Sequence, residues 1–544
     1  MTTRLAALTI ALSLTAGSLT VGTALAQTAS DAIVSAAPDL KALVDTPVLQ
    51  PGDESGAAEL RTSLEPYVTK QAFENGVISI EPTDEGYRLD FALQALIDSI
   101  PAAKDMSITI SDYSVLVSEQ PDGRWYVSAS GPLAFGYKLD TPPGAPHNDA
   151  VPQSVEYDTE TMDWTGYFDP SIATYSNWEG YFGKTRQVQR STDGTVTAVT
   201  EPIRVQFSGR PATDGTVDME VIQFGGGARQ EMNVPLDPAN PQSILPIVIS
   251  NGAAESVTIG KEVKTKELLR LYAVGLQLIQ DPERKGLLEE LKSALQMALP
   301  LWTDLASETK VSGFNVDLGS FGSGQVGSLD FDMDLDGISE AGDYTMAYDL
   351  SDMSVSSPFV PEWANALIPT RVLIRFDAEN VDLWRPAAVL ISDLRLDPKA
   401  PISEEAKGKI IELFKTSQAK LGLKNSAVTG RNYHIDYSAE FEDGDVAVQV
   451  QAEGIDAVIA SLQEASQQYP EALQGVSFLQ IAKGFGRPAG DDALEWNVDI
   501  ASDGSVTVNG AMLKGPDPTP LPGSGNQPLD LDAPPPTSQP SDPL

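Results

Sequence analysis

The sequence predicts an α+β protein built mainly from antiparallel β-sheets in meander order, with amphipathic helices between the strands. Polar and apolar residues alternate in short runs, which is the two-residue period of a strand with one buried face. Asp-Gly pairs separate many of these runs, and they suit the positive φ angles of tight hairpin turns. Longer segments repeat their apolar residues every three or four positions, as amphipathic helices do.

Hairpin turns are expected at six Asp-Gly pairs, namely Asp122-Gly123, Asp193-Gly194, Asp214-Gly215, Asp336-Gly337, Asp443-Gly444 and Asp503-Gly504. The clearest single strand covers residues 433–441, where Ile435, Tyr437 and Ala439 share an apolar side. Further strands are expected over 87–91, 115–120, 124–130, 371–383, 446–451 and 507–512.

Two neighbouring segments, 262–280 and 285–307, are expected to form a helical hairpin. Asp281-Pro282 separates them, and Pro300 is expected to kink the second helix. Shorter helices are expected over 57–67, 92–100, 455–465 and 475–483.

A later helix is expected to begin after Ser403, whose hydroxyl can cap its first turn. Glu404 and Glu405 would lie in that turn, where negative charge is favourable. Its buried side is expected to hold Ile410, Leu413, Phe414 and Leu421.

A strand that leads directly into a short amphipathic helix occurs twice, over 87–100 and over 446–462. One interpretation is a duplicated unit. Two short matches are weak evidence in a chain of this size, and a chain without duplication is the favoured interpretation.

The chain divides by composition into a signal peptide (1–26), a loose N-terminal lead (27–56), an N-terminal meander domain (57–260), a C-terminal region that opens with the helical hairpin (261–513) and a disordered tail (514–544). The tail contains ten prolines from Pro516 onward. Such a composition favours extended conformers and cannot build a core. A solvated end and a docking strand for an envelope partner are both compatible with it.

The N-terminus has the three parts of a secretory signal peptide. Arg4 supplies the positive charge, an apolar stretch follows over 5–19, and Ala24-Leu25-Ala26 gives the small-x-small cleavage pattern. The apolar stretch is too short and too often interrupted by Ser, Thr and Gly to anchor the chain in a bilayer. We expect cleavage before Gln27 and a periplasmic or secreted protein that does not span the membrane.

The chain is strongly acidic, with 36 basic and 77 acidic residues and a formal net charge of −41. Charge of this sign repels nucleic acid and keeps a protein soluble, so nucleic acid is not an expected partner. A surface that collects cations or a basic partner is the alternative interpretation. The chain has no cysteine, which excludes disulfides, a thiolate nucleophile and a cysteine zinc site.

Asp332, Asp334, Asp336 and Asp343 are weak candidate calcium ligands. With Gly337 they match much of the spacing of an EF-hand loop, in which alternate carboxylates supply oxygen ligands. The first three aspartates, however, alternate strictly with apolar residues, which is typical of a strand. We expect a strand and hairpin with the acids on one wet face, and an incidental cation site is the alternative.

An aromatic cluster over 157–182, interleaved with acids, is the candidate ligand surface, with Trp164, Tyr167, Tyr175 and Trp178 at its centre. Aromatic faces flanked by carboxylates suit sugar binding, and paired carboxylates can hydrolyse glycosidic bonds. Aromatic residues are also favoured in strands and form β cores. Core packing is expected, with a ligand surface and catalysis as the alternatives.

No catalytic or cofactor-binding motif is present. His147 lies in a proline-rich loop and His434 on the polar side of a strand, so they make a poor case for a metal centre or triad. Gly225-Gly226-Gly227 lies between two strand-like runs and is expected to form a bulge or turn rather than a nucleotide cradle. We predict no catalytic residue and no cofactor.

The Ala24-Leu25-Ala26 cleavage site, the acidic meanders that turn at Asp-Gly and the link 355–364 before the run 371–383 together resemble uncharacterised periplasmic β-meander proteins of proteobacteria. The resemblance is one of style and covers most of the mature chain. It implies an envelope protein and transfers no functional residue.

The sequence therefore favours an exported, soluble envelope protein that binds or scaffolds rather than catalyses, with an envelope partner or an apolar or glycan ligand. One alternative is a carrier of lipid, in which inward strand positions would line a continuous cavity. The other is a carboxylate-dependent glycan hydrolase. It requires two acids that face each other across a cleft floored by Trp164 or Trp178.

Overall fold

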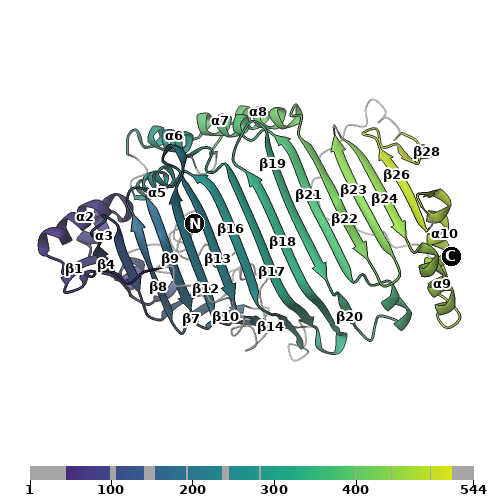
Figure 1. Cartoon of the computed structure of the whole chain (residues 1–544), viewed down its shortest axis with the longest axis horizontal. Helices are drawn as coiled ribbons and strands as arrows, with labels where there is room; N and C mark the ends of the chain where they lie inside the picture. Colours follow the sequence, from purple (N-terminus) through teal and green to yellow (C-terminus); the bar gives the residue numbers. More distant parts are fainter. Residues whose placement is uncertain are drawn as a thin grey trace, which may run out of the picture.

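The computed structural model describes residues 44–98, 106–139, 154–191, 194–235, 244–280, 284–397, 400–442, 444–490 and 492–516. Its strands form one sheet of 28 strands in which every pairing is antiparallel. The sheet runs along the long axis of the molecule (Figure 1). The prediction of a mainly antiparallel, meander-like sheet with interleaved helices is confirmed.

The strands are β1 (Ile78–Thr83), β2 (Gly86–Phe91), β3 (Met106–Ile110), β4 (Tyr113–Glu119), β5 (Trp125–Ala129), β6 (Leu133–Leu139), β7 (Ser154–Thr159), β8 (Met162–Asp169), β9 (Thr174–Phe182), β10 (Thr185–Ser191), β11 (Gly194–Thr200), β12 (Ile203–Pro211), β13 (Val217–Gly225), β14 (Ala228–Pro235), β15 (Ile244–Asn251), β16 (Ala254–Val263), β17 (Asp304–Asp317), β18 (Ser323–Asp336), β19 (Gly342–Ser351), β20 (Ser354–Ser356), β21 (Arg371–Val381), β22 (Lys420–Thr429), β23 (His434–Glu442), β24 (Asp445–Glu453), β25 (Arg487–Pro488), β26 (Ala493–Ile500), β27 (Val506–Val508) and β28 (Ala511–Lys514).

The described α-helices are α2 (Glu54–Val68), α3 (Lys70–Glu74), α4 (Leu93–Asp98), α5 (Thr265–Gln280), α6 (Leu287–Ala298), α7 (Trp384–Asp393), α8 (Glu404–Lys415), α9 (Ile455–Ala465) and α10 (Ala472–Phe485). Short 3-10 turns are η2 (Thr213–Gly215), η3 (Gly319–Phe321) and η4 (Glu362–Ala366).

The expected Asp-Gly turns join strands that pair with each other. Asp122-Gly123 joins β4 to β5, Asp214-Gly215 joins β12 to β13, Asp336-Gly337 joins β18 to β19 and Asp503-Gly504 joins β26 to β27. Asp193 and Asp443 lie outside the described residues, although the strands on either side of them, β10 with β11 and β23 with β24, also pair. These turns make neighbours in the chain neighbours in the sheet.

Between β3 and β16 the sheet consists of long strands that are each interrupted once near the middle. One band of pieces pairs in the order β4, β5, β8, β9, β12, β13, β16, and the other in the order β3, β6, β7, β10, β11, β14, β15. Gly226 and Gly227 form one of the interruptions, between β13 and β14, so the expected bulge or turn at the glycine run is present. The two bands join at β17, which pairs with both β15 and β16.

Helical pairs are inserted into connections between strands that still pair directly. Helices α5 and α6 connect β16 to β17, α7 and α8 connect β21 to β22, and α9 and α10 lie between β24 and β26. In Figure 1, α5 to α8 lie beside the ends of the strands, along one long side of the sheet. Helices α2 and α3 lie at one end of the sheet, and α9 and α10 lie at the other end. No helix in the described part of the chain has the length and apolar character needed to cross a bilayer.

The helical hairpin differs from the prediction at both of its ends. Helix α5 begins at Thr265 because β16 continues to Val263, and α6 ends at Ala298 rather than at residue 307. Ser307 belongs to β17, where it pairs with Thr258 and their hydroxyls lie 2.9 Å apart. Residues 304–307, which were expected in the second helix, therefore form the start of β17 instead, because they pair with β16.

The helix after Ser403 is present, and the Ser403 hydroxyl accepts a hydrogen bond from the backbone N–H of Ala406 at 3.1 Å. Phe414 and Leu421 were wrongly placed on its buried side, because Phe414 is 46% exposed and Leu421 lies beyond the helix. Helix α8 ends at Lys415, and Leu421 pairs with Ala378 of β21 and Phe441 of β23. Helix α7 was not predicted. Its Pro386 lies in the first turn, where a missing N–H costs nothing.

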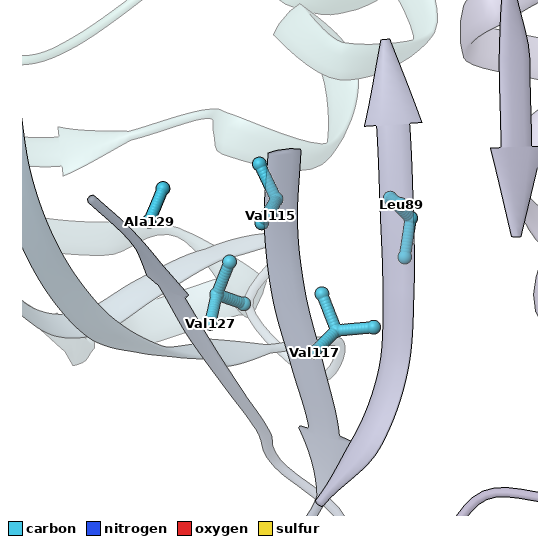
Figure 2. Close-up of a cluster of buried hydrophobic side chains, with 5 residues drawn as sticks. All are labelled: Leu89, Val115, Val117, Val127 and Ala129. Carbon is cyan, nitrogen blue, oxygen red and sulfur yellow. The ribbon is translucent and has the colours of Figure 1, made fainter. Parts of the chain in front are cut away.

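The best-covered part of the sheet is at its N-terminal end. Figure 2 shows Leu89 of β2, Val115 and Val117 of β4, and Val127 and Ala129 of β5 as one cluster of buried side chains. The partly buried apolar side chains packed against it include two from α2, Leu60 and Leu64. A second cluster at the opposite end joins α9 and α10 and includes Leu462 and Ala472.

Candidate ligand-binding face

The sheet from β18 to β26 has one apolar side, which we call the apolar face. In β18 the residues Leu329, Phe331, Met333 and Leu335 lie on this side, alternating with aspartates on the other. The register continues the pattern into the neighbouring strands, because directly paired residues share a face. The apolar residues that alternate with polar ones along each strand therefore form continuous rows across the sheet.

One row passes through Met333, Met346, Phe376, Leu423, Ala439, Val448 and Val498. A second passes through Leu335, Tyr344, Ala378, Leu421, Phe441, Val446 and Ile500. A third passes through Leu329, Leu350, Val372, Val428, Ile435, Ala452 and Leu494. No charged residue occurs in these three rows.

The apolar face is open. Large side chains on it remain exposed to water, with Met346 at 38%, Phe441 at 43%, Phe376 at 49% and Leu421 at 51% of their full accessible surface. Within the described strands from β18 to β26 the buried apolar side chains on this face are two alanines, at positions 439 and 452. A filled core would bury the large side chains first, so this face is a surface and not a finished core.

The opposite face of β17 to β19 is acidic. Asp332 pairs with Glu308 and lies two residues from Asp330, so like charges are neighbours both across and along the strand. Partial burial, and after it repulsion from Glu308 and Asp330, raises the pKa of Asp332. This face is therefore one on which negative charge is unfavourably crowded.

The candidate calcium residues lie on β18 and at the start of β19. Asp336 Oδ2 accepts a hydrogen bond from the backbone N–H of Asp343 at 2.8 Å, and Asp343 Oδ1 accepts one from the backbone N–H of Asn380 at 2.9 Å. The strand expected for this segment is present. Across the described residues, no group of three or more His, Asp or Glu side chains is arranged to hold a metal ion.

Three of the four aromatic candidates are brought together. Trp164 of β8 lies 6.3 Å from both Tyr175 and Trp178 of β9, measured between ring centroids. The Trp164 indole N–H donates to the hydroxyl of Tyr113, and burial raises the pKa of Tyr113 and of Tyr175 to about 12. Trp164 and Tyr175 pack against the buried cluster of β2, β4 and β5, which agrees with the core interpretation.

Tyr167 lies apart from the other three aromatic residues, on the opposite face of the sheet. It is 5% exposed, it pairs with Tyr126 at 5.7 Å between ring centroids, and the Arg124 guanidinium lies 4.7 Å above its ring. Its hydroxyl donates to the backbone carbonyl of Asp45 at 3.1 Å. Tyr167 thus fastens the segment before α2 to the sheet.

A shallow hollow of about 410 Å³ lies over β8, β9 and β12. Its lining includes Trp164, Asp163, Glu179, Tyr181 and Arg204. Asp163 accepts hydrogen bonds from the hydroxyls of Ser130 and Thr161. The hollow is open to solvent. Its two acids lie on the same face as Tyr167, whereas the Trp164 side chain lies on the other face with Trp178, so the hollow does not join the acids to the indole.

His434 takes part in the hydrogen bonding of the sheet. Its Nδ1 lies 2.8 Å from the Thr429 hydroxyl and its Nε2 lies 3.1 Å from Asp436. His147, residues 1–43 with the expected signal peptide, and the tail beyond residue 516 lie outside the described residues.

Comparison with known proteins returns no matching family model, no matching curated protein and no matching solved structure.

The apolar face was not predicted as a site, because the alternating apolar residues of these strands were expected to pack in a core. Consecutive strands from β18 to β26 each carry bulky apolar residues on one side, whereas the helices α7 to α10 lie at the edge and end of the sheet rather than across it (Figure 1). The apolar residues were visible in the sequence, but the helix positions that leave them uncovered are a property of the tertiary structure.

Proposed function

We propose that the protein binds a lipid-like apolar ligand along the apolar face of β18 to β26 and serves as an exported carrier of that ligand. The observation that supports this most directly is the exposure of Met346, Phe376, Leu421 and Phe441 on a face whose rows contain no charged residue. Large contiguous apolar surfaces on soluble proteins mark binding sites.

The size of the face suits a flexible chain. The seven strands β18, β19, β21, β22, β23, β24 and β26 lie side by side, and at about 4.8 Å per strand they span roughly 30 Å. Each ligand methylene buried there contributes about 0.8 kcal/mol. About ten methylenes would give roughly 8 kcal/mol, which corresponds to a micromolar dissociation constant before the entropic costs of binding.

A glycan ligand fits this face poorly because sugar hydroxyls need polar partners. The three rows provide a single side-chain hydroxyl, that of Tyr344, and it already donates to the Gly337 carbonyl at 3.1 Å. The hollow over β8, β9 and β12 supplies such partners through Asp163 and Glu179, but these acids lie on the face opposite the Trp164 side chain. The Trp164 ring is held by Tyr113, Tyr175 and Trp178. We therefore favour lipid over glycan.

The test measures binding of a fluorescent fatty acid to the delipidated protein. Phe441→Asp places a charge on the apolar face, and Gln449→Asp places the same charge on an exposed residue of the polar face of β24. We expect Phe441→Asp to weaken binding about tenfold or more, because a buried charge opposes an apolar ligand. Gln449→Asp should change binding less than about twofold, because it lies on the other side of the sheet.

Equal effects of the two variants would contradict the proposal. Thermal unfolding of both variants checks that each retains its fold. Native mass spectrometry of protein isolated from its own cells supplies an independent result, because a carrier should retain lipid and a pure scaffold should not.

A further inference from the structure

Helix α10 presents apolar side chains on both of its sides. One side packs in the cluster with α9, through Ala472, Val476 and Leu479. The other side leaves Phe478 70% exposed and Ile481 63% exposed. A helix at the surface of a protein normally turns polar residues to solvent, so the two large apolar side chains on the outward side of α10 lack the cover that they would have in a core.

The exposed side of α10 extends along the whole helix. Leu473 and Phe485, near the two ends of α10, are 51% and 41% exposed. The outward side of α10 therefore carries an apolar patch made by Leu473, Phe478, Ile481 and Phe485, which we call the α10 patch. Asn509 ties the end of α10 to the β27–β28 hairpin, since its Nδ2 donates to the Phe485 carbonyl at 2.7 Å. That hairpin exposes Met512 at 67% and Leu513 at 51%.

The charge of α10 is also unusual for this protein. Although the chain has a net charge of −41, α10 contains no Asp or Glu, and every other α-helix of the described residues contains at least one. Its one charged residue, Lys483, pairs with Asp456 of α9 at 2.7 Å. The α10 patch is thus the place where an otherwise acidic protein can approach lipid head groups with little electrostatic repulsion.

The inward side of α10 is continuous with the apolar face. The indole N–H of Trp496 in β26 donates to the backbone carbonyl of Ala482 at 2.8 Å. Trp496 lies on the same side of β26 as Val498 and Ile500, which belong to the apolar rows. The helix therefore connects the α10 patch on one side to the apolar face on the other.

We propose that the α10 patch seats the C-terminal end of the sheet on the surface of a lipid bilayer, so that lipid passes between that bilayer and the apolar face. The second half of this statement rests on the proposed function. Interfacial helices bind by burying apolar side chains to the depth of the head groups. Because Lys483 is already paired, the binding is driven by apolar contact, and neutral head groups suffice.

The experiment measures co-flotation with phosphatidylcholine vesicles of the chain isolated from its producing cells, with the intact mass recorded. Phe478→Ser/Ile481→Ser changes the α10 patch. Ile411→Ser/Phe414→Ser is the matched control, because these residues of α8 are 54% and 46% exposed at the same spacing, in a helix that carries acids. We expect about a tenfold or greater loss of vesicle binding for the α10 variant and less than about a twofold loss for the α8 variant.

Fatty-acid binding without vesicles separates the two proposals. Unchanged fatty-acid binding in an α10 variant that has lost vesicle binding supports both of them. Failure of the unaltered protein to float, with fatty-acid binding intact, overturns membrane docking and leaves the carrier function standing. Loss of a dimer in the α10 variant, seen by mass photometry, would show that a second copy covers the patch and would also overturn docking. Added phosphatidylglycerol should not strengthen binding, and a strong gain would contradict the apolar mechanism.

Discussion

Leucine-to-alanine substitutions at one buried and one exposed position can test whether the apolar face is open in solution. Leu287 of α6 is 0% exposed and packs with Val274 and Ala294, whereas Leu421 of β22 is 51% exposed on the apolar face. Truncation of a fully buried leucine removes its transfer free energy and leaves a cavity, and it costs about 3 to 5 kcal/mol. Half of the Leu421 side chain is already in water and no closed cavity forms, so Leu421→Ala should cost about 1 kcal/mol.

Urea unfolding followed by tryptophan fluorescence measures both costs. A chain of this size need not unfold in one step. Amide hydrogen exchange in α6 and in β22 therefore shows whether each loss of stability falls in the element that carries the substitution. The measurement is made on delipidated protein and repeated with fatty acid present. Ligand should enlarge the effect of Leu421→Ala, since a ligand that binds the native state contributes to its stability. A cost near about 3 kcal/mol for Leu421→Ala in the delipidated protein, the value for a buried leucine, would refute the open face.

Three further predictions concern charge and processing. Asp332→Asn should raise the melting temperature at pH 7, because the raised pKa of Asp332 means that its ionised form destabilises the native state; this gain should shrink as the pH falls to about 4, near the unfolded pKa. Calcium at about millimolar concentration should raise the melting temperature only slightly, and magnesium at equal ionic strength should match it, because both screen the acidic face; a calcium-specific rise that Asp332→Ala abolishes would show a true site. N-terminal sequencing of the exported protein should begin at Gln27, and an intact Met1 would contradict the expected cleavage.

The strand pattern and most of the turns could be predicted because they depend on local chemistry. The Asp-Gly pairs fix hairpins within a few residues, and the alternation in β18 and β23 fixes which side chains share a face. Helix ends were predicted less well. Ser307 and Leu421 each fit a helical period, yet both lie in strands because pairing with β16 and β23 decides their conformation.

The candidate site was harder to predict than the fold. Alternation shows that one side of a strand is apolar, but it does not show whether anything lies against that side. Phe376 and Val127 look alike in the sequence, yet one is 49% exposed and the other 8% exposed. The cluster that contains Val127 is covered by Leu60 and Leu64 of the distant α2 and by aromatic side chains of the sheet such as Trp164 and Tyr175. Such coverage depends on tertiary arrangement and not on the local pattern.

Most strands that follow each other in the chain also pair in the sheet, and this determines how the sheet can become longer or shorter. Each hairpin from β18 onward contacts mainly the strands before and after it, as repeats do in solenoid proteins. Stability is then close to a sum of local contributions, and a hairpin can be gained or lost without disturbing the register elsewhere. The span of the apolar face is therefore a quantity that evolution, or an engineer, can adjust two strands at a time.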